Sequence, residues 1–515
     1  MGSSRRIIIN TVATYGRSLL SFGFTLFTAR WVLEALGEED FGLYGVVGSV
    51  MFFIALFNTT QTSTVARYFA CAIGKESRVA TAGAETGGLT EWFNVAMFVH
   101  MVLPLLLLGI GYPLGVCAFK YLLNVPDARM EACLFVFRLS LLALFASTLS
   151  VPYVAMFVAH QYISQLVLFS LVQVFGLLAG SYSLLYVTGD RLEYYASMVF
   201  LLNLTVLALE VFFARRRFPE CRIAFRCMFR KDSVLSMLRY SAWKFLGDLS
   251  WGARNYATAF VANVGFGPVA NAAISVSNQL SAQAASLCNT LANAFTPAIA
   301  TEEGAGERVR MIELSLRCCK FGALMLLFVS VPLVTEMGYW LVLWLKTPPV
   351  GSHSLCVCMI LTSLIAYLTK GHQLAIQSYG KIASWQFCDA MAYLSALPMS
   401  IAFVWLGWGL VSIGYSFVIS AFLVSVVRVV FAQRLLAFPV KVWLKSVCKP
   451  IFLVGLLSGG LAVLAHMTLE EGFCRLVIVT VLTICSSAFW SWKIVLDSGE
   501  KMYVLRVVRR VLGHD

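Results

Sequence analysis

Charged residues are scarce in this sequence, and their scarcity argues against a water-soluble globular protein. Asp, Glu, Lys and Arg make up 13% of the 515 residues, whereas 59% are hydrophobic. Runs of about 20 apolar residues, the length that crosses the hydrocarbon core of a bilayer, recur along almost the whole chain. We therefore predict an all-α polytopic membrane protein with no sizeable soluble domain.

The motifs of catalytic and nucleotide-driven proteins are missing too. The six histidines are dispersed, and there is no Walker motif, no Gly-rich phosphate loop and no cluster of paired carboxylates. The 14 cysteines lie mostly inside apolar runs, and the closest pairs, Cys318 with Cys319 and Cys356 with Cys358, lack the spacing of a zinc site. We expect no enzyme, no metal and no cofactor.

What the sequence does contain is a series of runs long enough to be membrane spans. We expect fourteen helices, covering residues 8–31, 41–66, 91–114, 132–157, 163–187, 194–214, 238–264, 268–299, 315–335, 355–376, 382–406, 410–433, 447–466 and 473–494. Because this number is even, both ends of the chain are expected on the same side of the membrane.

Lysine and arginine are distributed unevenly between the loops on the two sides. The loops on the side of the N-terminus hold most of them, whereas the opposite loops hold few: Lys120, Arg129, Arg191, Lys346 and Arg475. The positive-inside rule then places both termini in the cytoplasm. Membrane topology also accounts for the net charge of +13, so nucleic acid is not expected as a partner.

The most basic connection divides the chain into two halves. We predict an N-terminal six-helix lobe at 1–214, a basic cytoplasmic linker at 215–237, a C-terminal six-helix lobe at 238–434, and two additional helices with a cytoplasmic tail at 435–515. Arginines alternate with apolar residues in the linker, which is typical of a segment lying on an anionic membrane surface.

The two lobes are predicted to be repeats of one another. A shift of 230 residues without a gap aligns Gly74 with Gly304 and Thr25 with Asn255. Repeated membrane lobes commonly face each other about a pseudo-twofold axis. We therefore expect two pseudo-repeated six-helix lobes, with the first and seventh spans equivalent.

Polar residues follow one face of the first span. They recur at steps of three and four residues: Asn10, Thr14, Arg17, Ser21, Thr25 and Thr28. This is the spacing of one helical face, and lipid disfavours an arginine in such a place by about 2.5–3.5 kcal/mol on insertion scales. We expect the stripe to line a solvated cavity, with Arg17, Ser21 and Thr25 as candidate binding residues.

Later spans carry further charged and amide side chains. Arg138 interrupts an apolar run, and we expect its charge to be held by a bound ligand or by a carboxylate such as Asp389.

The seventh and eighth spans are the most polar of the later ones. Lys244 and Asp248 are four residues apart and are expected to neutralise each other, which leaves Arg254 without an evident local partner. Asn255 follows Arg254, and Asn278 belongs to a row of amides and hydroxyls in the eighth span. Such amides either bind sugar hydroxyls or hold helices together, and the sequence leaves both roles open.

The stretch from Asn10 to Lys75 carries a family resemblance. A polar-striped first helix ends in TARWVLEALGEEDFGLYGVVGSV, and a second helix ends in ARYFACAIGK. This pattern resembles the oligosaccharide flippases of the Wzx type, in the superfamily that also holds lipid II flippases and multidrug exporters of the MATE type. Beyond Lys75 the resemblance rests on the number and spacing of the helices.

The resemblance implies a flippase that moves an undecaprenyl-diphosphate-linked oligosaccharide across the bacterial inner membrane for the synthesis of a surface polysaccharide such as O-antigen. Membrane lipids, a coupling ion (proton or sodium) and a polysaccharide polymerase are the implied partners. The last two spans would either shape a groove for the polyprenyl tail, as in the lipid II branch, or pad the second lobe.

Three other functions compete with this interpretation. A lipid II-type flippase is the nearest, because its substrate also combines sugar with diphosphate. A cation-coupled drug exporter would need acidic residues in its lobes, and the first six spans have almost none. A polymerase or ligase of lipid-linked glycans would need a large outer loop for its catalytic residues, and the outer loops at 120–129 and 336–353 are short.

The predicted topology can be tested with reporter fusions. A reporter at Gly37 is expected to be active outside the cytoplasm, and reporters at Arg222 and Asp515 inside it, because the basic loops stay in the cytoplasm. An external signal at Arg222 would contradict the topology.

Overall fold

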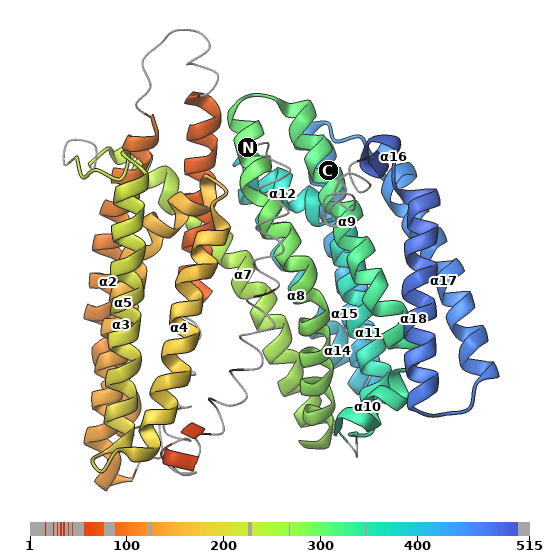
Figure 1. Ribbon diagram of the computed structural model, residues 1–515, viewed down its shortest axis with the longest axis horizontal. Helices are drawn as coiled ribbons and strands as arrows, with labels where there is room; N and C mark the ends of the chain where they lie inside the picture. The colour runs from red at the N-terminus through yellow and green to blue at the C-terminus, as the bar shows by residue number, and fades with distance from the viewer. Residues whose placement is uncertain are drawn as a thin grey trace, which may run out of the picture. The chain divides into compact units, whose positions relative to one another are not determined.

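The described part of the chain, in the computed structural model, consists of helices joined by turns and loops (Figure 1). The structure describes residues 56–76, 88–121, 126–224, 229–266, 268–345 and 348–502, together with scattered residues between Gly16 and Tyr44. No β-strand occurs among these residues. The all-α polytopic class is therefore confirmed, while the expected span 8–31 and the first part of 41–66 lie mostly outside the described residues.

Nine helices of the described part are long and apolar enough to cross a membrane, or ten if the bent pair α11 (Ser352–Leu368) and α12 (Lys370–Tyr379) forms one span. The helices α7 (Lys231–Phe266) and α8 (Pro268–Gly304) have the length but carry many polar side chains, and they do not belong to this group. The total of fourteen spans stays a prediction.

The chain divides into two compact units. The first unit comprises Met1–Asp248 and Thr296–Arg308, and the second comprises Leu249–Phe295 and Val309–Asp515. The division falls inside α7 and α8, so each of these helices contributes to both units. The lobe limits expected at 214 and 238 stay a prediction.

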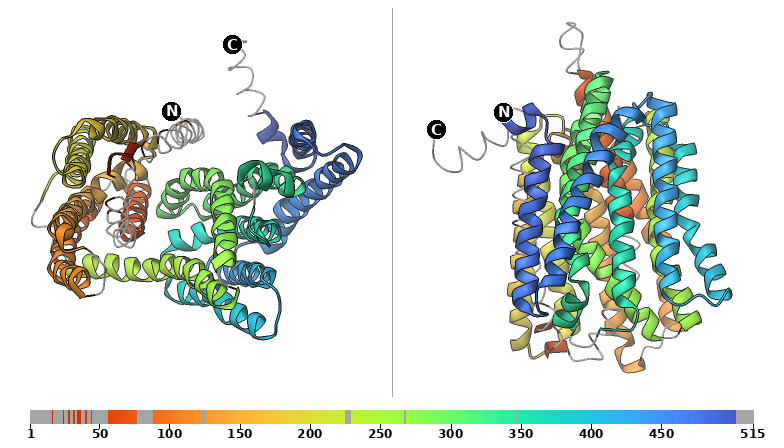
Figure 2. Two further views of the ribbon diagram at one scale, coloured as in Figure 1. Left: turned by 90° about the horizontal axis from the view of Figure 1, so that it is seen from below. Right: turned by 90° about the vertical axis from the view of Figure 1, so that its right-hand side faces the viewer.

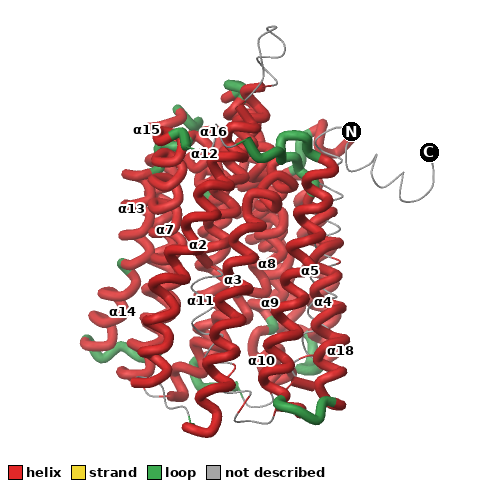
Figure 3. Tube along the Cα trace, turned by 90° about the vertical axis from the view of Figure 1, so that its left-hand side faces the viewer, coloured by secondary structure: helices red, strands yellow, loops and turns green. Residues whose placement is uncertain are grey.

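Four helices form the main bundle of the first unit: α2 (Gly88–Tyr121), α3 (Met130–Ala159), α4 (Ile163–Ser183) and α5 (Arg191–Arg217). Figure 3 shows them side by side, with α3 packed against both α2 and α5. Buried apolar side chains of these helices, including Phe119, Phe137 and Leu192, form the core between them.

The basic linker of the first unit is fastened to the beginning of α2. Asn94 is fully buried, and its amide donates to the carbonyl of Arg222 (3.1 Å) and accepts from the backbone N–H of Ala224 (2.6 Å). Farther along, Arg230 forms an ion pair with Glu91 (2.9 Å). The side-chain amide of Asn94 thus satisfies one carbonyl and one N–H group of the linker backbone, which has no helical hydrogen bonds there.

The second unit is built around α11 and α15 (Val411–Leu436), which pack against each other along their length. The other helices of this unit are α9 (Arg308–Thr335), α10 (Met337–Leu345), α13 (Ala383–Leu394), α14 (Ala396–Trp405), α16 (Val440–Trp443), α17 (Lys449–Thr468) and α18 (Phe473–Trp490). Helices α17 and α18 form a hairpin, drawn in blue in Figure 2, whose side chains share an apolar core with α9.

The bend between α11 and α12 is supported by side chains from elsewhere in the second unit. The two helices meet at 46° beside Thr369. The indole N–H of Trp443 donates to the carbonyl of Leu368 (2.9 Å), and the hydroxyl of Ser425 donates to the carbonyl of Ile365 (3.2 Å). These bonds satisfy carbonyls that a broken helix leaves open, which is required where water is excluded.

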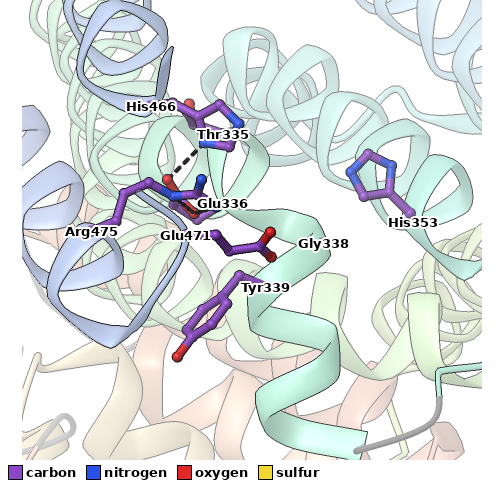
Figure 4. A pocket seen from close by; sticks show the side chains of 8 residues that line it. All are labelled: Thr335, Glu336, Gly338, Tyr339, His353, His466, Glu471 and Arg475. Carbon is purple, nitrogen blue, oxygen red and sulfur yellow. Dashed lines mark hydrogen bonds and ion pairs between the residues drawn. The ribbon is translucent and has the colours of Figure 1, made fainter. Parts of the chain in front are cut away.

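Polar side chains fasten the α17–α18 hairpin and the segment after it to α9. Glu336, at the junction of α9 and α10, accepts hydrogen bonds from His466 (2.8 Å) and Arg475 (3.2 Å), as Figure 4 shows. In the middle of α9, Lys320 pairs with Glu500 (2.6 Å), which follows α18 in the chain. The hairpin and α9 are therefore held together by charge as well as by apolar packing.

The pairing at Glu336 makes a testable prediction about stability. In Glu336→Leu, the buried charge of Arg475 loses its partner, and we expect a loss of about 3–5 kcal/mol in the free energy of unfolding. Thermal unfolding in detergent should show a lower melting temperature, and Arg475→Leu in the same chain should restore part of it. The control is Glu471→Gln, which changes an exposed carboxylate of the same region; equal losses in both single variants would contradict the prediction.

Candidate functional site

Three deeply buried charges of the second unit lie together on α7, α13 and α15. Arg428 and Asp389 are each 2% exposed, and Arg254 is 6% exposed. The Nε atom of Arg428 lies 3.3 Å from Asp389 Oδ1, and its Nη2 atom donates to the hydroxyl of Tyr393 (2.8 Å). We call Arg254, Asp389, Tyr393, Phe417 and Arg428 the arginine cluster.

Helical spacing explains how the chain assembles the arginine cluster. Asp389 and Tyr393 are four residues apart and so lie on one face of α13. That face is held against α15 by Ser420, whose hydroxyl donates to the carbonyl of Ala392 (2.8 Å). Arg428 comes two turns after Ser420 on α15, which places its guanidinium beside Asp389 and Tyr393.

Arg254 joins the arginine cluster through aromatic faces rather than through a carboxylate. Its guanidinium carbon lies 4.7 Å from the ring centre of Phe417 and 5.1 Å from that of Tyr393. Among the described residues, its polar contact is a long hydrogen bond to the amide oxygen of Asn255 (3.5 Å), and its Nε atom has no partner. Aromatic faces attract a cation but leave its N–H donors unsatisfied.

The arginine cluster therefore carries more positive than negative charge. Two guanidinium groups and one carboxylate are buried within it, so one positive charge is uncompensated by any described carboxylate. An uncompensated buried charge is unfavourable by several kcal/mol, and it is far less so when an anion occupies the site. The arrangement is thus suited to bind an anionic group.

A second polar group lies in the first unit, where α7 meets the helix formed by 56–76. Lys244 forms an ion pair with Asp248 (2.8 Å), as the sequence predicted, and Asp248 also accepts from the hydroxyl of Thr60 (2.6 Å). Nearby, the hydroxyl of Ser241 donates to the side-chain oxygen of Gln61. The positive charge of Lys244 is therefore balanced locally, unlike that of Arg254.

The structure gives a partner to Asp389, one of the groups that the sequence offered for Arg138. Asp389 was a candidate partner for Arg138, but its carboxylate lies beside Arg428 in the second unit. Arg138 is exposed on α3 and forms no hydrogen bond or ion pair with the residues that the structure describes. Helical periodicity did not reveal the pairing of Asp389 with Arg428, because the two residues are remote in the sequence.

The remaining predicted site residues are spread over the chain. Arg17, Ser21 and Thr25 lie outside the described residues. Asn255 lies beside Arg254, and Asn278 is half-buried on α8.

For the amides of α8, the sequence left open whether they bind sugar hydroxyls or hold helices together. One of these amides, Asn289, has a structural role in the second unit. Asn289 accepts a hydrogen bond from the hydroxyl of Tyr367 (2.6 Å) and so joins α8 to α11. This contact favours helix association for that one position.

Arg428 and Tyr393 are members of the arginine cluster that sequence reasoning missed. A signal for Arg428 was present, because it stands in the run FLVSVVRVVFA, well inside the expected span 410–433. An ionisable residue inside a membrane span is a candidate functional residue by default. Tyr393 carried no comparable signal, since a tyrosine in an apolar helix is common.

The described part of the chain also contains a pocket of about 270 Å³ around Glu336, Tyr339, His353 and Arg475 (Figure 4). Both carboxylate oxygens of Glu336 are hydrogen-bonded, to His466 and Arg475. No group of three or more potential metal ligands occurs among the described residues. We therefore interpret this region as the clamp of the α17–α18 hairpin rather than as the binding site.

Solved structures with the same fold are transporters of the MATE type. The chain is similar to a MATE protein in its bent conformation (14% identity, TM-score 0.73, 86% of this chain and 97% of the other). It is also similar to an outward-facing multidrug resistance MATE family transporter of the MOP superfamily (14%, 0.72, 85% and 96%). A third is a MOP superfamily transporter from Pyrococcus furiosus (14%, 0.71, 85% and 96%), in which a reverse polarity of the binding pocket is said to suggest a different function.

These likenesses show the fold, and they agree with the superfamily expected from Asn10 to Lys75. No curated protein matches the sequence. A family model does match, over residues 3–302, and its description is polysaccharide biosynthesis protein. The match covers more than half of the 515 residues, so this membrane protein with a MATE-type fold belongs to the polysaccharide biosynthesis protein family.

Proposed function

We propose that the protein is a flippase that moves an undecaprenyl-diphosphate-linked oligosaccharide from the inner to the outer leaflet of the bacterial inner membrane. Membership of the polysaccharide biosynthesis family supports the glycan, and the MATE-type fold supports transport across a membrane. The observation that carries the proposal is the excess positive charge of the arginine cluster, because the diphosphate of such a substrate is anionic.

The chemistry of arginine suits this substrate. A guanidinium group binds phosphate oxygens with two parallel N–H donors, and it keeps its charge in apolar surroundings. The Nε–H donor of Arg254 is not satisfied by the described residues, and the rings of Tyr393 and Phe417 lie against its guanidinium group. In this mechanism the cavity replaces the hydration of the headgroup, while the polyprenyl tail stays in the hydrocarbon of the bilayer.

The other site residues belong to the proposal as contacts of the sugar and diphosphate. They are Arg17, Ser21, Thr25, Arg138, Lys244, Asp248, Asn255 and Asn278. The proposal also includes cytoplasmic termini, a coupling ion (proton or sodium), and a polysaccharide polymerase that receives the flipped unit. The two lobes would alternate between states open to either side by rocking about the central site.

The choice among the alternatives depends on charge. A cation-coupled drug exporter needs a carboxylate that is available to a cation, but Asp389 is engaged by Arg428 and lies in a cluster with excess positive charge. A lipid II-type flippase fits the arginine cluster as well as the proposed flippase does, because both substrates contain diphosphate. Family membership favours the surface polysaccharide.

Substitution of Arg254 tests the proposed function. In Arg254→Gln, we expect surface polysaccharide to fall about tenfold in a complementation strain, because a charge-assisted contact to the diphosphate is worth about 1.5–3 kcal/mol. Arg254→Lys should keep part of the activity, since it retains the charge but loses the two-pronged geometry. The amount of protein in the membrane should stay normal in both variants.

Two variants of α15 serve as controls. Arg428→Gln leaves the buried Asp389 without its cation and should lower the amount of protein, while Arg434→Gln, at an exposed position near the end of α15, should change neither quantity. Normal export by Arg254→Gln at normal abundance would refute the role of the arginine cluster. A deletion strain that accumulates no undecaprenyl-linked repeat units would refute the proposed substrate.

A further inference from the structure

In the first unit, Gly74 packs directly against the helix that carries Gly304, and Gly304 packs against the helix that carries Gly74. A Cβ atom added to Gly74, at the end of the helix formed by 56–76, would lie 2.0 Å from the carbonyl oxygen of Thr301 on α8. A Cβ atom added to Gly304, at the end of α8, would lie 2.3 Å from the carbonyl oxygen of Cys71. Neither helix has room for any side chain at its glycine, so the two backbones touch.

This contact joins residues that are counterparts under the internal repeat. The shift of 230 residues carries Gly74 onto Gly304 and Cys71 onto Thr301. Gly74 lies against Thr301, and its counterpart Gly304 lies against Cys71, which is the counterpart of Thr301. Such a reciprocal pattern is the mark of a twofold relation, in which residue i meets j and j meets i.

The surroundings of this contact place it at the end of the molecule that carries basic loops. Lys75 follows the first glycine, and Arg308 follows the second after a tight turn at Gly306. The side chain of Arg308 pairs with Glu303 of α8 and so ties the turn to the helix end. Under the positive-inside rule this end faces the cytoplasm.

We propose that this glycine contact, between Gly74 with Cys71 and Gly304 with Thr301, is the cytoplasmic gate of the transport cycle. The inference rests on the proposed function. The glycine contact parts when a lipid-linked headgroup enters from the cytoplasm, and it re-forms before the headgroup leaves on the other side. Its position on the repeat's twofold relation lets both halves of the chain contribute equally to the closure.

The chemistry of the contact fits a reversible closure. Backbone packed on backbone leaves no gap for water or ions. The residues are small, and the thiol of Cys71 donates a weak hydrogen bond to the carbonyl of Ala300 (3.4 Å). Because the residues in contact are small, parting the helices at this point exposes little apolar surface.

A reversible cross-link tests whether the contact must part. Thr301→Cys, in a full-length chain that keeps Cys71 and lacks the other cysteines, is treated with a short bifunctional methanethiosulfonate. We expect mass spectrometry to find the two cysteines linked, surface polysaccharide to fall at least tenfold, and dithiothreitol to restore it. The matched control carries Thr301→Cys with Cys71→Ser and should be insensitive to the reagent.

Two outcomes of the cross-link would overturn the gate. Normal export by the linked chain would mean that the contact stays closed throughout transport. Failure to link would mean that Cys71 and Thr301 do not meet in the membrane.

A second measurement does not depend on the substrate. Gly304→Ala should wedge the contact apart, so a maleimide applied from the cytoplasmic side of membrane vesicles should alkylate Cys71 several-fold faster than in wild type. The control is Gly459→Ala on α17, where an added Cβ has no neighbour within 4 Å. Unchanged alkylation would refute the gate, whereas faster alkylation in a chain whose wild type exports no polysaccharide would refute only the proposed function.

Discussion

The constraint on which this structure depends is that a charge removed from water must find a partner inside the protein. The second unit meets it repeatedly: Asp389 pairs with Arg428, and Glu336 pairs with Arg475. Each of these groups joins helices that are apart in the sequence, so the same interactions that satisfy the charges also determine which helices are neighbours. Arg254 departs from the rule, since aromatic rings surround it where a carboxylate is expected.

That departure distinguishes Arg254, to which we assign a role in binding, from the arginines that are paired with carboxylates. A paired arginine stabilises the fold and leaves no excess charge to attract a ligand. Arg254 instead retains an Nε–H donor that no described residue satisfies, and at this buried position an electrostatic interaction is far stronger than at the surface. The family assignment supports the glycan part of the proposed substrate, and the charge of the arginine cluster supports its diphosphate.

Local patterns in the sequence predicted much of this architecture, and remote contacts account for what it missed. The pairing of Lys244 with Asp248 was predictable because a helix alone brings residues four apart together. The pairing of Arg428 with Asp389 depends on how α13 packs against α15, and nothing in either segment specifies it. The same holds for Trp443, whose indole supports a bend on another helix.

The attachment of the linker by Asn94 has a mechanical consequence. The backbone on either side of Ile223 is bonded to α2, and Arg230, directly before α7, is paired with Glu91. The described residues that follow α5 and those that precede α7 are thus both attached to the first turns of one helix. In the proposed transport cycle, a displacement at the first turn of α7 would therefore be transmitted to the first turns of α2.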